Sequence, residues 1–245
     1  MMNLEVSKIS IQIFLFLFVL LENLTANPIT HEKCSLQDAA CIKKQAQLAL
    51  PSFTEGVPEL EIQSFNKMHI KDIVFESTDM NYELRNIEIG GFNDTIIDDI
   101  SINMPFKLMR LSFHTTLKVD CDYKLDGLLF GVPAFGEGKA YITLNNMKVE
   151  MILIFDIVKN EQGKDIMDIK THIFGANAIG GVHTQLDNMF NGDKDKSEIF
   201  HALINENWRP IIANFGRSFS PTIIKGIFEA IKTYMRSRPL EDLAL

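Results

Sequence analysis

The stretch that decides the fold is MRLSFHTTLKVDCDY, residues 109–123. Mostly apolar side chains occupy every second position from Met109 to Tyr123, and polar side chains occupy the positions between them. This period is typical of a β-strand with one buried face. At about 3.4 Å per residue such a strand extends roughly 50 Å, so it must belong to a long, coiled antiparallel sheet.

A second long alternation follows the first. The glycine-rich segment 126–138 predicts the turn that leads into it. Apolar residues then share one phase over 140–144 and the opposite phase over 147–157. Asn145-Asn146 lies at the phase change, where a β-bulge would reconcile the two halves.

Shorter alternations complete the predicted sheet. Residues 82–92 and 95–104 predict two earlier strands. The segment NEQGK, residues 160–164, predicts a hairpin turn before a strand that contains residues 167–173. Together these patterns indicate at least five antiparallel strands before residue 187.

The region before the sheet carries weaker signals. Residues 36–50 are rich in Ala, Leu, Lys and Gln and predict a short helix that ends before Pro51. Residues 53–80 combine Gly, Pro and scattered apolar side chains. We expect them to form an irregular or edge segment.

The last part of the chain has a helical period. From 197 to 236 apolar residues recur at three- and four-residue steps and continue past Pro210 and Pro221, which predicts one long bent helix. So much apolar surface must be covered, and the long sheet is the available cover. The predicted fold class is therefore α+β, with a long curved antiparallel sheet wrapped around a long C-terminal helix.

Such an interior is predicted to hold an apolar cavity. A strongly curved sheet around one helix is difficult to fill with aliphatic side chains, and the chain contains 18 Phe and 11 Met, which suit the walls of an apolar pocket. An inward Phe or Met taken alone is more often ordinary core than part of a ligand site. The residues predicted to line a ligand tunnel are Leu111, Phe113, Leu117, Val119, Tyr123, Met151, Leu153, Phe155, Trp208, Phe215 and Phe219.

The N-terminus has the layout of a secretory signal peptide. Lys8 precedes an apolar run over residues 9–21, and Ala26 offers a small residue for cleavage. We expect residues 1–26 to be a signal peptide and residues 27–245 to form a single domain. The run is shorter than the roughly 20 residues of a spanning helix, so an uncleaved anchor is the weaker alternative. The mature protein is thus predicted to be secreted and extracellular, without stable membrane insertion.

A secreted protein can form disulfides and can be N-glycosylated, and the sequence offers candidates for both. In an oxidising compartment Cys34 and Cys41 are predicted to form a disulfide. Cys121 falls on the apolar face of its strand and is predicted to be a buried free thiol. Asn93-Asp94-Thr95 predicts N-glycosylation at Asn93.

Several classes of function are disfavoured. A net charge of −8 is repelled by phosphate backbones, so nucleic acid is not an expected partner. The six histidines show no metal-ligand spacing, and an acidic loop after Asp187 has Met189 where a calcium ligand is required. No metal or other cofactor is therefore expected. The chain lacks a G-x-S-x-G motif, so we predict no catalytic residues and no enzymatic activity.

Several segments, taken in order, resemble the insect juvenile hormone-binding protein and takeout family. They are Cys34-x6-Cys41, GVPEL at 56–60, DYKLDG at 122–127, GEGKAYITL at 136–144, LDNMFNGDK at 186–194 and LINENW at 203–208. The resemblance covers nearly the whole mature chain. It implies a tubular lipid-binding fold with a hydrophobic tunnel, the Cys34–Cys41 disulfide and a role in carrying isoprenoid-like or fatty ligands. Only Cys121 remains for the second disulfide of some members, so the likeness is to the takeout branch.

These observations predict a secreted, non-enzymatic carrier of a small hydrophobic ligand. Juvenile hormone, another terpenoid or a fatty acid-like molecule would bind in the internal tunnel, driven by the burial of apolar surface. The alternative is a secreted interaction or signalling protein whose core is structurally filled and holds no exchangeable ligand. Its partner would be a receptor or another carrier, which the sequence does not identify.

Overall fold

The computed structural model describes residues 32–216 and 220–245, so the predicted signal peptide lies outside the described residues. Within these ranges an eight-stranded antiparallel sheet dominates the unit Lys33–Leu245. Its order is β1-β3-β5-β6-β7, with β2 also beside β3, β4 beside β5 and β8 beside β6. The strands are β1 (Met68–Ile70), β2 (Ile73–Glu76), β3 (Met80–Gly90), β4 (Ile96–Asn103), β5 (Leu108–Leu129), β6 (Val132–Lys159), β7 (Asp165–Ala178) and β8 (Val182–Leu186).

The pairing of β5 with β6 is the centre of the sheet. The pair runs from Leu108 opposite Ile154 to Leu129 opposite Val132, and it contains the strand predicted from the alternation at 109–123. The predicted turn at 126–138 is wrong, because both strands continue to a turn at Phe130-Gly131. Glycines in this segment fit inside strands since the neighbouring backbone lies very close. A Cβ at Gly127 would stand 2.3 Å from the carbonyl oxygen of Asp79.

A line of irregularities crosses the sheet and divides it into two halves. Thr115 pairs with Met147 and Leu117 pairs with Leu144, so β6 carries one extra residue, as the phase change at Asn145-Asn146 predicted. Beside the bulge, the break between β7 and β8 is held by the Gly180 N–H, which donates to the carbonyl oxygen of Asn145 at 3.0 Å. The break therefore lies at the same level as the bulge.

The same line continues on the other side of β5. There the short 3-10 helix η2 (Phe92–Asp94) separates β3 from β4, which pair with successive parts of β5. The Thr115 hydroxyl donates to the carbonyl oxygen of Gly91 at 2.7 Å and fixes this corner. Gly91 has a φ of 104°, which favours glycine.

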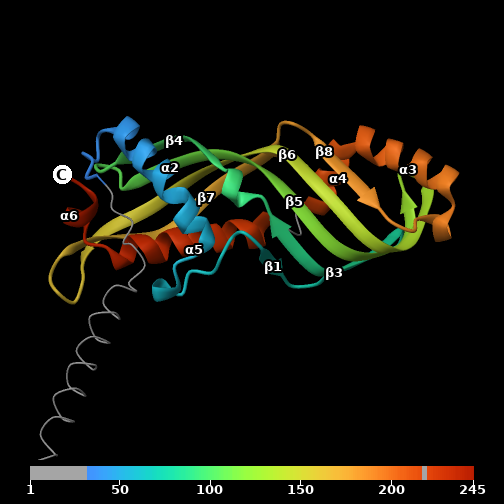
Figure 1. Ribbon diagram of the computed structural model, residues 1–245, viewed down its shortest axis with the longest axis horizontal. Coiled ribbons are helices and arrows are strands. Elements are labelled where there is room, and N and C mark those ends of the chain that lie inside the picture. Colours follow the sequence, from blue (N-terminus) through green and yellow to red (C-terminus); the bar gives the residue numbers. More distant parts are fainter. Residues whose placement is uncertain (1–31, 217–219) are drawn as a thin grey trace, which may run out of the picture. The chain divides into compact units, whose positions relative to one another are not determined.

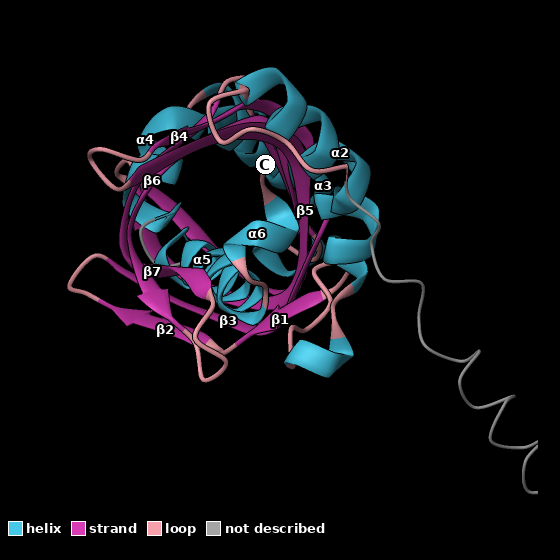
Figure 2. Cartoon of the chain, turned by 90° about the vertical axis from the view of Figure 1, so that its left-hand side faces the viewer, coloured by secondary structure: helices cyan, strands magenta, loops and turns pink. Residues whose placement is uncertain are grey.

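The C-terminal helix lies within the curve of the sheet (Figure 2). It is α5 (Ser220–Ser237), which packs against β7 and buries Ile224, Ile227, Phe228 and Ala230. Its last turn is held by the buried carboxylate of Asp168, which lies 3.5 Å from Arg236 and accepts a hydrogen bond from Lys170 at 2.5 Å. The Lys170 ammonium and the Arg236 guanidinium lower the pKa of Asp168. The fold class of a curved sheet around a C-terminal helix is confirmed.

The prediction of one helix over residues 197–236 is wrong. The described part of this run contains α3 (Lys194–Glu206), α4 (Trp208–Phe215) and α5. Helix α3 ends at Asn207, whose φ of −105° and ψ of 32° leave the helical region and whose side-chain amide donates to the carbonyl oxygen of Leu203. Figure 1 shows α3 and α4 beside β8, at the end of the sheet away from α2 (Ala39–Glu55) and α6 (Leu240–Leu243). The apolar period continues across the break since all three helices cover the same sheet. In the described ranges no helix is long and apolar enough to cross a bilayer.

The N-terminal helix α2 continues through Pro51, although it was predicted to stop there. A proline inside a helix removes one backbone hydrogen bond. The turn after Pro51 places the ring of Phe53 6.0 Å from that of Phe65 and 6.1 Å from that of Tyr234, and this packing offsets the loss. The side chain of Gln47 binds α2 to β4 by donating to the Thr95 carbonyl and accepting from the Ile97 N–H.

The two ends of this unit are joined to each other. The predicted Cys34–Cys41 disulfide is present, and Cys121 is a buried free thiol as predicted. The Leu245 N–H donates to the carbonyl oxygen of Cys34 at 3.0 Å. The ammonium of Lys164 lies 2.8 Å from Glu241, which places α6 beside the confirmed turn between β6 and β7.

The corner at Gly91 generates a stability prediction. Gly91→Ala should lower the free energy of unfolding by about 3 kcal/mol or more, because the added Cβ would stand 2.1 Å from the Thr116 carbonyl oxygen. Gly163→Ala is the matched control: its φ is also positive, at 75°, but a Cβ there meets nothing within 4 Å, so only the left-handed penalty of about 1–2 kcal/mol is expected. Urea unfolding measures both variants, and equal losses would contradict the role given to this corner.

Candidate functional site

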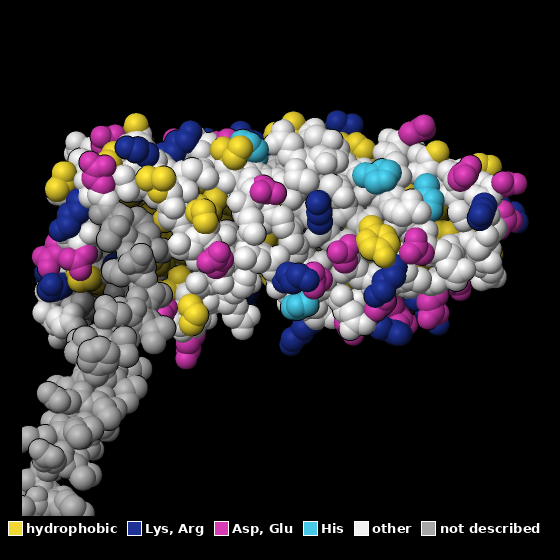
Figure 3. Space-filling view, in the orientation of Figure 1, with side chains coloured by type: hydrophobic (Ala, Val, Ile, Leu, Met, Phe, Trp, Pro, Cys, Tyr) yellow, Lys and Arg dark blue, Asp and Glu magenta, His cyan; other side chains and the backbone are white. Residues whose placement is uncertain are grey.

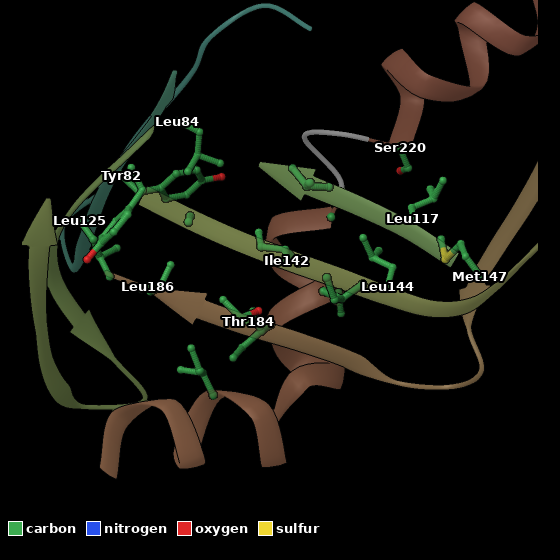
Figure 4. Close-up of a pocket in the computed structure, with 18 of the residues that line it drawn as sticks. Tyr82, Leu84, Leu117, Leu125, Ile142, Leu144, Met147, Thr184, Leu186 and Ser220 are labelled. Carbon is green, nitrogen blue, oxygen red and sulfur yellow. The ribbon is translucent and has the colours of Figure 1, made fainter. Parts of the chain in front are cut away.

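An apolar cavity of about 510 Å³ lies between the sheet and the helices in the half that carries β8 (Figure 4). Five strands and three helices supply its walls. The lining residues are Met80, Tyr82, Leu84, Leu117, Val119, Tyr123, Lys124, Leu125, Leu129, Ala140, Ile142, Leu144, Met147, Phe174, Gly175, Ala176, Thr184, Leu186, Phe200, Ile204, Ile211, Ile212, Ala213, Gly216, Ser220 and Ile223.

The bulge at Asn145-Asn146 decides which face of β6 lines the cavity. Side chains alternate between the two faces of a strand, so residues an even number of positions apart normally share a face. Ile142 lines the cavity, whereas Ile152 on the same strand is 41% exposed on the outer face. Because the extra residue lies between them, Met151 and Leu153 take the buried positions instead.

Helix α3 closes one side of the cavity and is bound to the free edge of β8. The side-chain amide of Asn205 accepts from the Thr184 N–H at 2.6 Å and donates to the Thr184 carbonyl oxygen at 3.0 Å. One turn earlier, Nε2 of His201 accepts from the Leu186 N–H at 2.9 Å, and burial lowers the pKa of this imidazole. The neighbouring face of the helix then carries Phe200 and Ile204 into the cavity wall.

The polar side chains that line the cavity are few. They are Tyr82, Tyr123, Lys124, Thr184 and Ser220, and Lys124 is exposed. The hydroxyl of Tyr123 donates to the carbonyl oxygen of Asp187 at 2.6 Å, and burial raises its pKa to about 12. The Tyr123 hydroxyl therefore stays uncharged well above neutral pH.

The free cysteine of β5, Cys121, is buried on the same face of the strand as Val119 and Tyr123 but does not line the cavity. Burial raises the pKa of the Cys121 thiol to about 11, so it remains protonated at neutral pH and is a poor nucleophile. In the part of the chain that the structure describes, no group of three His, Cys, Asp or Glu side chains could hold a metal ion. The arrangement is suited to holding an apolar molecule.

Part of the cavity lining is exposed, and apart from Lys124 it consists of small residues. Gly175 and Ala176 on β7, the last strand in the sheet order, and Ala213 on α4 are exposed. Ala176 pairs with the buried Val149 and so faces inward, whereas Gly175 pairs with the exposed Glu150 and faces outward. The cavity is thus accessible from solvent at β7 and α4.

The residues predicted to line the tunnel fall into three sets. Leu117, Val119 and Tyr123 line the cavity. A second set is buried in the other half of the sheet and does not line the cavity: Leu111, Phe113, Met151, Leu153 and Phe155. Trp208 does not line the cavity either; it lies at the start of α4, where the guanidinium of Arg209 is 4.5 Å from the centre of its ring. The side chain of Phe215 and the whole of Phe219 lie outside the described residues.

Sequence reasoning missed much of the wall. Ala140, Ile142 and Leu144 belong to the phase that precedes the bulge, so the alternation already contained the signal for them. Thr184 and Leu186 lie on a strand of five residues, which is too short for a clear alternation.

A curled antiparallel sheet that holds an apolar cavity against C-terminal helices is the architecture of a class of proteins that bind small hydrophobic ligands. The chain belongs to the haemolymph juvenile hormone binding protein family, whose family model matches residues 13–245. The resemblance seen in the sequence is thereby confirmed.

Individual relatives agree with this assignment. The circadian clock-controlled protein daywake of Drosophila melanogaster is 23% identical over 231 residues, which cover 88% of this chain and 87% of that protein. The juvenile hormone-binding protein of Manduca sexta is 20% identical over 156 residues, 61% of this chain and 65% of that protein. The crystal structure of Epiphyas postvittana Takeout 1 superposes with a TM-score of 0.80 at 25% identity, over 87% of this chain and 99% of that one.

The hydrogen bond of Tyr123 generates a pH prediction. Tyr123→Phe should cost about 1 kcal/mol at pH 7, since the Asp187 carbonyl loses its donor. The raised pKa of Tyr123 means that the unfolded chain releases its proton first, so wild-type stability falls as the pH rises from about 10 towards 12. The difference between the two proteins should therefore shrink above pH 10. Urea unfolding from pH 7 to 11 measures it, and a constant difference would contradict this assignment.

Proposed function

We propose that this protein is a carrier that binds a small hydrophobic molecule in the cavity between β8 and the C-terminal helices. The observation that supports the proposal is the cavity itself, about 510 Å³ in volume and lined mainly by aliphatic and aromatic side chains. This volume lies within the range of roughly 300–1,000 Å³ that is usual for small-molecule sites. The names of the family and of the Manduca sexta relative point to juvenile hormone, and other terpenoids or fatty acid-like molecules have the same apolar character.

The physical basis of binding is the removal of apolar surface from water. Burying about 400 Å² at about 25 cal/mol per Å² contributes roughly 10 kcal/mol before association costs of several kcal/mol. Binding at micromolar concentration or tighter is therefore expected. The protein would act by solubilising its ligand, without chemical conversion.

We also propose that the protein is secreted. A disulfide between Cys34 and Cys41 persists in oxidising compartments, which agrees with the signal peptide predicted at residues 1–26. Asn93 is exposed on η2 and is accessible for the glycosylation that its sequence motif predicts.

Extraction of the protein with organic solvent, followed by mass spectrometry, tests the carrier function directly. A bound hydrophobic molecule, displaced by a fluorescent fatty probe, is the expected result. Ile142→Trp should fill the cavity and weaken probe binding at least about tenfold. Ile152→Trp, on the outer face of the same strand, should bind the probe as the wild type does. Failure to find any bound molecule or probe binding would favour the alternative, an interaction protein with no exchangeable ligand.

The opening beside β7 gives a kinetic prediction. Ala176→Trp adds a large ring at an exposed, inward-facing position of the lining, so the fold should tolerate it. The rates of probe uptake and release should both fall, while the equilibrium affinity changes little. Stopped-flow fluorescence measures the two rates. Unchanged rates in a folded variant would place the route of entry elsewhere.

A further inference from the structure

We propose that the turn between β5 and β6 docks reversibly on a lipid bilayer. The proposal rests on the carrier function and names the source from which the ligand is taken up. The docking element is the apolar tip, defined here as Leu128, Phe130, Val132 and Pro133. It is distinct from the cavity, since none of these four residues lines it.

The apolar tip is exposed and uncharged. Leu128, Phe130 and Val132 are 47%, 50% and 42% exposed, and Pro133 is exposed beside them. The segment GLLFGVPAFG, residues 127–136, contains no charged residue, whereas 23% of the whole chain is charged. Figure 3 shows Lys, Arg, Asp and Glu side chains spread over the face that it displays. The apolar tip thus gathers four exposed apolar side chains in a segment without any charged residue.

The backbone of the turn is not optimal for the residue that it carries. Phe130 has a φ of 55° and Gly131 a φ of 79°. Turns in which both central residues have positive φ prefer Asn-Gly, and a bulky residue at the first position is strained. The chain therefore accepts strain to present an exposed phenyl ring at this tip.

The size and charge of the tip favour a bilayer over a protein partner. A stable protein interface buries about 800 Å² on each partner and involves about 20–30 residues, far more than four side chains on a hairpin turn provide. Shallow insertion into the interfacial region of a membrane needs only a few apolar side chains. Because the chain has a net charge of −8, the bilayer surface that fits it is zwitterionic.

The strand that enters the tip also forms the cavity wall. Leu125 and Leu129 of β5 line the cavity, and Leu129 pairs with Val132 across the turn. Docking by the tip would hold the cavity half of the sheet next to the bilayer, where hydrophobic ligands are most concentrated. This arrangement would shorten the path of the ligand through water.

Vesicle binding of the Phe130→Asn variant tests the proposal. Wild-type protein should co-sediment with phosphatidylcholine vesicles, and less with vesicles that also contain phosphatidylserine. Phe130→Asn restores an Asn-Gly turn, so its stability should be equal to or above that of the wild type, while vesicle binding falls about tenfold. Phe106→Asn is the matched control, because Phe106 is 74% exposed at the opposite end of β5 and its loss should leave vesicle binding unchanged.

The remaining outcomes overturn the inference. Equal vesicle binding by wild type and Phe130→Asn would exclude the tip as the docking element. If sedimentation shows that Phe130→Asn instead converts a dimer into a monomer, the tip is a surface for self-association. Probe binding in vesicle-free solution keeps the two proposals separate: normal binding without any vesicle association rejects docking and retains the carrier function, whereas absent probe binding rejects the carrier function itself.

Discussion

The register between β5 and β6 is the constraint on which the rest of the structure depends. It fixes which side chains of the two longest strands point inward, and the extra residue at Asn145-Asn146 reverses that choice half-way along β6. The corner at Gly91 and the break between β7 and β8 lie at the same level of the sheet as this extra residue. The irregularities in β5–β6, between β3 and β4, and between β7 and β8 thus lie at one level. The sheet can therefore curve around helices in both halves and still keep one apolar face inside.

The two halves use that apolar face differently. In the half covered by α2 and α5, side chains such as Phe155, Met151 and Leu153 are fully buried against one another. In the other half the inward residues include the smaller Ala140, and residues of α3 and α4 form part of the cavity wall. Side-chain size and the positions of α3 and α4 thus leave space for the cavity in the half that carries β8.

The sequence predicted those parts of the fold that have a regular period. Alternation at residues 109–123 identified β5, and the phase change at Asn145-Asn146 identified the bulge, since a two-residue period leaves no other explanation. Local rules failed where tertiary contacts compensate for them. Helix α2 passes through Pro51 because Phe53 packs beyond it, and the glycines at 127–138 lie in strands because neighbouring backbone fills the space of a side chain.

The residues of the candidate site were only partly predictable, because tertiary contacts also decide which inward side chains line the cavity. Leu117 and Phe113 share one strand and one face, so alternation cannot tell that the first lines the cavity and the second does not. That distinction depends on where α3 and α4 lie, and the helical period of residues 197–236 was compatible with a single continuous helix. The break at Asn207, whose side chain caps α3, leaves no trace in the apolar pattern.

The contact between Leu245 and Cys34 makes one end of the sheet a natural place for attachment. A fusion partner or dye appended after Leu245 would emerge beside the Cys34–Cys41 bridge and the turn between β6 and β7. Since β6 runs from that turn to Phe130-Gly131, such an addition would be separated from α3 by the length of the longest strand. Immobilising the protein through its carboxyl end would leave the ligand-binding half free in solution.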